Sequence, residues 1–112
     1  MTAVRAPLRR GSTRAGVPPS ALVALADPVR WSIVALLGRE ELCVCHLVEE
    51  LDITQPLVSH HLKVLREAGV VAREKYRYWT YYRLVPGTLT AVADQLHRAA
   101  EQEPAVDRRP CC

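Results

Sequence analysis

The most distinctive side chains in this sequence are four cysteines in two close pairs, Cys43 with Cys45 and Cys111 with Cys112. A secreted disulfide framework spaces its cysteines along the chain, so such pairs are more typical of ion ligands or redox thiols. In an extended segment that enters a helix, residues i and i+2 point the same way. We expect Cys45 at or near a helix N-cap, where the dipole favours thiolate over thiol. The first pair therefore predicts a site for a thiophilic ion.

The second pair ends a segment, 103–112, that contains two prolines and three charged residues after Glu103. We expect this segment to be flexible and outside any packed core. Its cysteines could form an ion-binding arm, form a redox pair, or have no role. Together, the two pairs could supply the three sulfurs that a trigonal thiolate site requires.

Helical periodicity and cap signals indicate the elements that must position these thiols. Asp27-Pro28 is a typical N-cap and first helical residue, and Gly38 a typical helix end. Two helices then flank a tight turn at 52–54, and a stretch rich in Val, Tyr, Trp and Thr follows. We expect a short helical stripe from Ser20, helices over about 28–38, 45–52 and 55–69, a hairpin over 70–84, and a last helix from Pro86.

Helix-turn-helix followed by a β-hairpin predicts a mainly α fold, a winged helix-turn-helix with an α-helical dimerisation face. We place this domain at 20–102, between a basic tail at 1–19 and the cysteine-containing tail at 103–112. Six Lys and Arg against two Glu occupy the stretch from Lys63 to Arg83, whereas the stretch from Glu40 to Asp52 has five acids and no base. Positive charge is thus concentrated where a recognition helix and wing would contact DNA.

A helical wheel on 55–69 separates an apolar face from a polar arc that can reach base edges and phosphates. His61 leans toward the core and is expected to pack there. The hairpin would present basic side chains to phosphates or the minor groove, while its aromatic side chains are expected to be structural. Tyr82 and Leu84 alternate with Trp79 and Tyr81, so one set should pack inward. The predicted DNA-contacting residues are Gln55, Ser59, His60, Lys63, Arg66, Arg73, Lys75 and Arg77.

The apolar stripe of the last helix is longer than so small a domain needs, which favours a homodimer. A two-fold dimer would place two recognition helices about 34 Å apart on an inverted repeat of double-stranded DNA. The residues predicted to form the dimer face are Leu22, Leu25, Leu89, Val92 and Leu96.

Three segments resemble the ArsR family of bacterial metalloregulatory repressors: ELCVCHLVEEL (41–51), TQPLVSHHLKVLREAGVV (54–71) and YWTYYRL (78–84). The resemblance covers about 21–96, and ELCVC is characteristic of the arsenic-responsive members. It implies a winged-helix homodimer that represses its own operon, typically one for arsenical resistance. Arsenite or antimonite would act as the inducer that releases the DNA.

The same resemblance assigns Cys43 and Cys45 to the first two thiolates of the family motif ELCVCDLC. His46 stands where Asp is usual, and Val48 stands where the third cysteine would be. We therefore expect Cys111 or Cys112 to supply the third ligand, from the same or the other subunit. Other members use C-terminal vicinal cysteines in a similar way, sometimes for a methylated trivalent arsenical.

Two other readings of the thiols stay open. Cys43, Cys45 and His46 could contribute to a zinc or cadmium site, or the thiols could sense oxidation. An enzyme is not expected, because C-x-C at a motif entry in 112 residues offers neither a redox C-x-x-C nor a roomy pocket. No run of eighteen apolar residues exists and no apolar segment follows the basic N-terminus, so we expect a cytoplasmic protein without a membrane segment or secretory signal.

Overall fold

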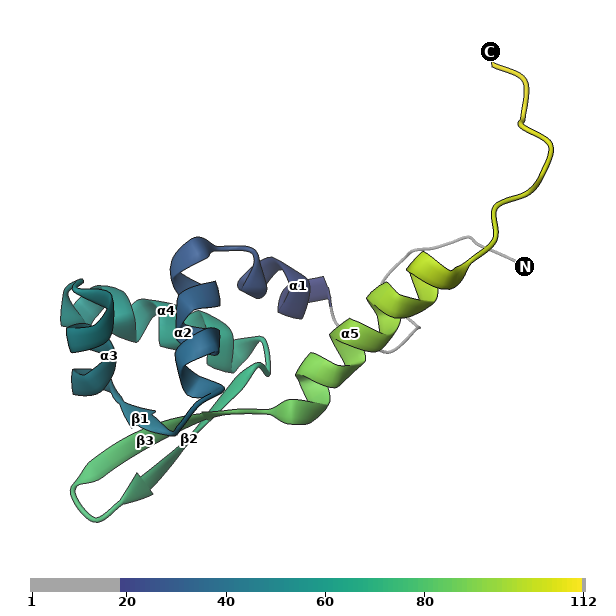
Figure 1. Ribbon diagram of the computed structural model, residues 1–112. Coiled ribbons are helices and arrows are strands. Elements are labelled where there is room, and N and C mark those ends of the chain that lie inside the picture. Colours follow the sequence, from purple (N-terminus) through teal and green to yellow (C-terminus); the bar gives the residue numbers. More distant parts are fainter. Residues whose placement is uncertain (1–18, 112) are drawn as a thin grey trace.

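The computed structural model describes residues 19–111, so the expected N-terminal tail and Cys112 lie outside the described residues. Five helices and three short strands form a helical body with a hairpin on one side, as the predicted fold class requires (Figure 1). The elements are α1 (Pro19–Leu25), α2 (Pro28–Leu37), β1 (Leu42–Cys43), α3 (Val44–Leu51), α4 (Gln55–Glu67), β2 (Val71–Tyr76), β3 (Trp79–Leu84) and α5 (Pro86–Glu101).

The start of α2 follows directly from its sequence. The Asp27 carboxylate accepts hydrogen bonds from the backbone N–H groups of Val29 and Arg30, at 2.9 and 3.0 Å, and Pro28 occupies the first helical position. These contacts satisfy two N–H groups that the helix itself leaves unpaired. Gly38 is the C-cap, so both predicted ends of this helix are confirmed.

Helix α4 is anchored through one apolar face. Val58, Leu62 and Leu65 are fully buried, and they pack in one core with Leu47 of α3 and Ile33 of α2. The predicted apolar face of the second motif helix is therefore confirmed. Because α3 also packs directly on α4, a displacement of α3 acts on the helix that would read DNA.

The hairpin is part of a three-stranded antiparallel sheet in the order β1-β3-β2, and the sequence did not predict β1. Leu42 pairs with Tyr82, and Cys43 pairs with Tyr81. At the far end, Tyr76 pairs with Trp79 across a two-residue turn. The sheet thus joins the cysteine segment to the wing by backbone hydrogen bonds.

Helix α5 leaves the body and carries the C-terminal segment away from the sheet (Figure 1). Its first half contributes Val92 to the core, whereas Leu96 in its second half is 59% exposed. Helix α1 packs beside α5. Among the described residues, no helix is long and apolar enough to cross a membrane.

Candidate functional site

Three candidate ligand atoms meet where β1 ends and α3 begins. The Sγ atoms of Cys43 and Cys45 are 2.9 Å apart, and the Nδ1 atom of His46 is 3.2 Å from Sγ of Cys43. One ligand atom from each of the three residues lies within 4.8 Å of the other two. Two sulfurs and an imidazole nitrogen form a donor set suited to soft or borderline ions such as Zn²⁺.

The backbone reaches this arrangement differently from the sequence prediction. Cys43, rather than Cys45, is the N-cap of α3, and Cys45 already lies in the first helical turn. The sulfurs converge because the extended cap residue folds its side chain over that turn. Sγ of Cys43 accepts the backbone N–H of His46, and Nδ1 of His46 accepts the backbone N–H of Cys43 at 3.4 Å. This reciprocal capping box holds Cys43 and His46 in place before any ion binds.

The two thiols differ in acidity. Burial of Cys43 acts to raise its pKa, but hydrogen bonds from the Cys45 thiol and from nearby backbone N–H groups outweigh burial and lower that pKa. The pKa of Cys45 is raised, first because its thiol hydrogen bonds to Cys43 and then by burial. Cys43 is accordingly the more acidic thiol of the pair, which moves the predicted helix-dipole effect from Cys45 to Cys43.

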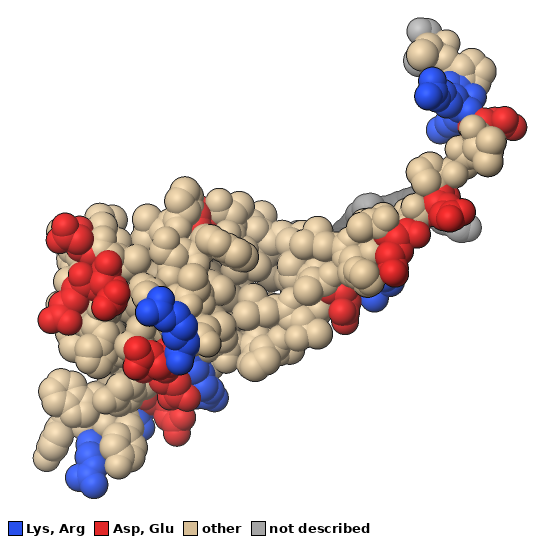
Figure 2. Space-filling model, viewed as in Figure 1, with Lys and Arg blue, Asp and Glu red and all other residues tan. Residues whose placement is uncertain are grey.

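A cavity with a mostly acidic polar lining borders His46, one member of this cluster. The cavity, of about 350 Å³ and also bordered by Tyr81, has four glutamates in its wall: Glu40, Glu41, Glu49 and Glu50. Acidic groups gather over the α3 end of the molecule (Figure 2). Arg39 is the one basic residue in the same wall, so the cavity has an excess of negative charge, which disfavours anions relative to neutral or cationic species.

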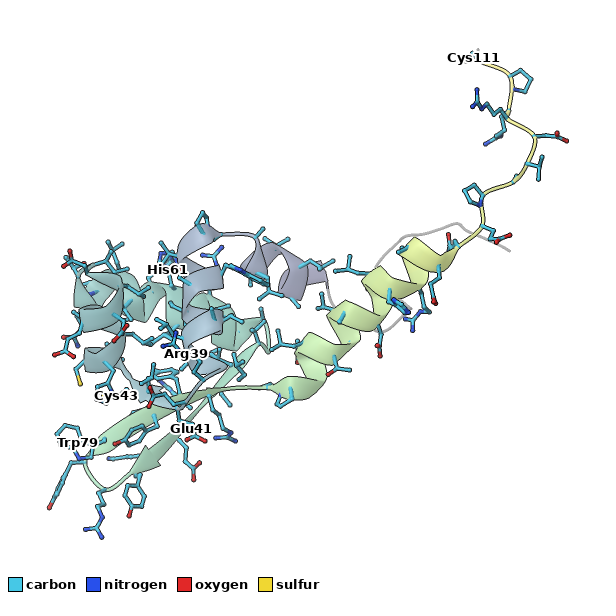
Figure 3. All side chains as sticks on the ribbon, viewed as in Figure 1. Arg39, Glu41, Cys43, His61, Trp79 and Cys111 are labelled. Carbon is cyan, nitrogen blue, oxygen red and sulfur yellow. The ribbon has the colours of Figure 1, made fainter. Side chains whose placement is uncertain are left out.

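The structure does not bring Cys111 of the second cysteine pair to this site within one chain. Cys111 is exposed, and it lies at the opposite end of the molecule from Cys43 (Figure 3). Cys112 lies outside the described residues. A third sulfur from this segment would have to come from another copy of the chain or after a large movement of the segment.

The predicted DNA-contacting side chains of α4 lie mostly in solvent. Gln55, Ser59, His60 and Lys63 are exposed, while Arg66 is half-buried. They occupy the helix arc opposite the buried face. Backbone geometry and solvent access therefore leave this arc free to contact a groove.

His61 is partly buried, as predicted, but it also has polar partners that the sequence did not indicate. Nη1 of Arg30 lies 3.2 Å from Nδ1 of His61, and the Asp27 carboxylate lies 3.9 Å from the same atom. Burial is the main cause that lowers the pKa of His61, and Arg30 also lowers it while Asp27 raises it. Nε of Arg30 donates to the carbonyl of Ala24 at 2.7 Å, so one guanidinium links α1, α2 and α4.

The hairpin places its side chains on two faces. Tyr82 is buried and Leu84 half-buried, whereas Trp79 is exposed, so of the two alternating sets the one with Tyr82 and Leu84 packs inward. Arg73, Lys75 and Arg77 are exposed. The prediction that the wing aromatics are structural is wrong at the tip, where Tyr76, Tyr78 and Trp79 are 59%, 92% and 55% exposed. Among residues 19–111, the helices therefore leave the aromatic side chains at the end of the sheet exposed.

The predicted dimer residues divide into two groups. Val92 is buried within the chain itself, and Leu25 and Leu89 are half-buried against the core. Leu22 is 41% exposed, and Leu96 is 59% exposed. The free part of the apolar stripe is therefore on α1 and on the second half of α5.

Comparison with known proteins identifies relatives of regulatory function. A family model described as "Bacterial regulatory protein, arsR family" matches residues 27–73. The arsenic resistance transcriptional regulator ArsR1 of Pseudomonas putida is 46% identical over 70 residues, which are 62% of this chain and 55% of that protein. The arsenical resistance operon repressor of Escherichia coli is 40% identical over 83 residues, covering 70% of this chain and 71% of the repressor.

A third relative carries a different name. The HTH-type transcriptional repressor SmtB of Mycobacterium tuberculosis is 46% identical over 81 residues, which are 71% of this chain and 60% of that protein. The matched part of the chain thus spans little more than half of the P. putida and M. tuberculosis relatives. All three relatives are named as transcriptional regulators or repressors, and none as an enzyme.

Solved structures agree with the sequence matches. An ArsR-like transcriptional regulator from a Rhodococcus species superposes with a TM-score of 0.68 at 29% identity, covering 73% of this chain and 77% of that one. HlyU from Vibrio cholerae superposes with a TM-score of 0.61 at 32% identity, covering 75% of this chain and 91% of HlyU. The fold, the motif helices and the relatives together show that this chain belongs to the ArsR family of bacterial regulatory proteins.

Proposed function

We propose that this chain is a DNA-binding repressor of an arsenic-resistance operon, and that trivalent arsenic or antimony releases it from DNA by binding cysteine thiolates. The observation that carries the proposal is the cluster of Cys43, Cys45 and His46 at the start of α3, the helix that packs on α4. Relatives named for arsenic resistance support arsenic as the ion. A protein that represses a bacterial operon would act in the cytoplasm, where the DNA is.

The donor set fits a trivalent arsenical. Arsenic(III) forms its bonds with soft thiolates, and its hydroxide is neutral near pH 7. The acidic cavity beside the cluster would admit such a neutral species more readily than the arsenate anion. A methylated trivalent arsenical has two exchangeable positions, which Cys43 and Cys45 would fill by themselves.

Inorganic arsenite calls for a third sulfur. In our proposal, Cys111 or Cys112 of a second copy supplies it, because Cys111 of the same chain lies at the far end of the molecule (Figure 3). Exposed Leu22 and Leu96 would form part of the surface that joins the two copies. The dimer would set two α4 helices about 34 Å apart on an inverted repeat, with Gln55, Ser59, His60 and Lys63 facing the bases.

Cys43 can transmit a change at the site by two structural routes. It caps α3, which packs on α4, and it pairs with Tyr81 of β3, which continues into the wing. A shift of Cys43 would therefore act on the reading helix and on the hairpin together. A hundredfold loss of DNA affinity needs a coupling free energy of only about 2.8 kcal/mol.

The test is a titration of inducers into a labelled protein–DNA complex, using a duplex that the wild-type protein itself selects from a random library. Arsenite, antimonite, methylarsenite, Cd²⁺ and Zn²⁺ are added separately to wild type and to the double variant Cys111→Ser with Cys112→Ser. We expect arsenite and antimonite to release wild type at the lowest concentrations, and methylarsenite to release both proteins alike. Retention of DNA at saturating arsenite, with release by Cd²⁺ or Zn²⁺ alone, would overturn the arsenic proposal.

One observation favours a second candidate, a repressor that senses Zn²⁺ or Cd²⁺. Nδ1 of His46 is directed at Sγ of Cys43, and imidazole is a good ligand for these ions. The SmtB relative supports it. His46→Ala separates the two candidates: it should weaken a Zn²⁺ or Cd²⁺ response at least tenfold, while an arsenite response through the two thiolates persists. A peroxide arm in the same titration tests the remaining alternative, thiol oxidation.

A further inference from the structure

A contact between α2 and α4, outside the proposed ion site, joins Arg30 to His61. His61 lies where α4 meets α2, and its Nδ1 atom is 3.2 Å from Nη1 of Arg30 (Figure 3). A guanidinium has N–H donors and no acceptor, so Nδ1 must accept this hydrogen bond and the proton of the neutral ring must be on Nε2. The contact therefore exists only while His61 is neutral.

An acidic partner for the protonated ring is already nearby. Oδ2 of Asp27 lies 3.9 Å from the same Nδ1 atom, which is too far for a hydrogen bond. A protonated imidazole donates from both nitrogens and carries a positive charge, so it would lose the Arg30 contact and be attracted to Asp27. Charge-assisted N–H···O bonds measure about 2.7–2.9 Å, so the ring would move by about 1 Å to reach the carboxylate. Protonation thus exchanges one partner of Nδ1 for another.

The ring has little room to make that exchange alone. The His61 side chain is only 15% exposed, and its neighbour Leu62 is buried in the core. The His61 ring also makes an edge contact with the ring of His60, at 5.5 Å between centres, and His60 is exposed on the predicted DNA-contacting arc. In a close-packed interior, a shift of the ring is shared with the helix that carries it. A movement at His61 is therefore passed to the surface of α4 that would contact bases.

Both partners of His61 are held by contacts of their own. Nε of Arg30 donates to the Ala24 carbonyl of α1 at 2.7 Å, and Oδ2 of Asp27 caps α2 by accepting two backbone N–H groups. The charged and titratable groups that act on the ring are Asp27, Arg30 and His60, and none from α1, α3 or β2 is among them within residues 19–111. A change in the charge of His61 should therefore move α4 rather than its partners on α2.

We propose that His61 is a proton-controlled positioning residue for α4. The neutral ring, bonded to Arg30, holds α4 in the placement that binds the operator, and the protonated ring, drawn to Asp27, shifts α4 and weakens operator binding. Base-edge contacts depend on hydrogen-bond distances, so a shift of about 1 Å is enough to break them. Because burial lowers the pKa of His61, the loss should appear below the ordinary value of 6.5. The inference rests on the DNA-binding half of the proposed function and is independent of the inducer.

The first experiment measures operator affinity of the full chain without inducer from about pH 7.5 to about pH 5.5, for wild type and His61→Gln. Glutamine can still accept a hydrogen bond from Arg30 but does not titrate, and His60 is present in both proteins. The ratio of wild-type Kd to His61→Gln Kd should rise at least about threefold as the pH falls. Far-UV circular dichroism at each pH checks that both proteins are folded.

The matched control is His97→Gln, which removes an exposed histidine of α5, and its Kd should follow that of wild type at every pH. A contact that served only to stabilise the fold would change Kd by the same factor at each pH. A constant ratio of wild-type to His61→Gln affinity would therefore overturn the proposal.

Two further variants should shift the pH of the loss in opposite directions. Asp27→Asn keeps a good N-cap for α2 and removes the carboxylate that attracts the protonated ring, so the loss of affinity should move to lower pH. Arg30→Gln removes the cation that opposes protonation, so the loss should move to higher pH. A shift of both variants in the same direction, or no shift in either, would contradict the roles assigned to the two partners.

Nuclear magnetic resonance of the histidine rings tests the exchange without DNA. The chain has four histidines, so the other three are internal references. The pKa of His61 should fall in Asp27→Asn and rise in Arg30→Gln, and the backbone amide resonances of α4 should change with the same midpoint in each protein. Amides of α4 that do not follow the ring would rule out a positioning role. If the protein selected no duplex, the proposed function would fail, while this titration would still decide whether His61 moves α4.

Discussion

The start of α3 and the C-terminal segment both carry cysteines, but their surroundings have almost nothing in common. Cys43 is buried, caps a helix, pairs with a strand and lies 2.9 Å from a second sulfur. Cys111 is exposed and follows nine residues, 102–110, that contain no helix or strand. The first region is organised before an ion arrives, and the second must be ordered by the ion or by a partner. We therefore expect the site at the start of α3 to supply most of the free energy of ion binding. Any displacement of α4 that follows ion binding should also begin there.

The largest difference between the two regions should be in stability. Leu47 of α3 is completely buried, so Leu47→Ala should lower the free energy of unfolding by about 2–5 kcal/mol through lost burial and a residual cavity. Val106→Ala in the C-terminal segment should change it by less than about 0.5 kcal/mol. Urea denaturation of both variants provides the measurement. Equal costs would mean that the segment is packed in solution.

The second prediction compares the thiols as ligands. Cys43→Ser keeps a good helix cap and removes one soft ligand, so arsenite affinity should fall at least about a hundredfold without loss of helix α3. The double variant Cys111→Ser with Cys112→Ser should lose at most about tenfold, because ordering a free segment offsets much of the gain from a third bond. Isothermal titration calorimetry measures both. A larger loss in the double variant would reverse the ranking of the two regions.

The third prediction concerns reactivity within the first region. The Cys45 thiol hydrogen bonds to Cys43 and helps to lower the pKa of Cys43. Cys45→Ala should therefore raise that pKa and slow alkylation of Cys43 by iodoacetamide several-fold near neutral pH. Mass spectrometry of the labelled protein over a pH series reports the rate at each cysteine. Cys111 in the same sample is an internal reference, and a parallel change there would show that the effect is not local.

The smallest expected effect is a pH dependence centred on His61, outside both thiol regions. Burial lowers the folded-state pKa of this imidazole below the ordinary 6.5, so the unfolded chain binds the proton first. Stability should thus be intact above about pH 6.5 and decrease as pH falls from there toward the folded-state pKa. His61→Gln should remove this part of the slope in thermal melts between pH 5 and 8. His97→Gln, on the exposed side of α5, controls for the loss of an imidazole.

The elements that position the site could be predicted because each has a local signal. Asp27-Pro28 starts α2, and the spacing of Val58, Leu62 and Leu65 defines the buried face of α4. These patterns depend on residues within one or two turns of each other, and the structure confirms them. Helix-turn-helix and hairpin then follow in the order that the sequence predicts.

The remaining features depend on contacts between distant residues. A two-residue strand such as β1 is too short to show alternation, so the sequence gives no signal for its pairing with β3. The sequence therefore predicts a helix N-cap at or near Cys45, whereas the N-cap is Cys43. Arg30 and His61 are 31 positions apart and meet only through the packing of α2 on α4. The alternation in the wing indicates two faces, but it does not reveal that Tyr76, Tyr78 and Trp79 are exposed within the described part of the chain.

Helix α5 leaves the body after Val92 and extends well beyond it. Sixteen residues of α-helix measure about 24 Å, so a tilt of about 10° at its base displaces its far end by about 4 Å. If two copies are held together through the outer half of α5, the same tilt moves the two α4 helices relative to each other by a comparable distance. Half-sites one helical turn apart tolerate little change in that separation. A small rotation where the helix meets the core would then be enough to take both reading helices out of register with the DNA.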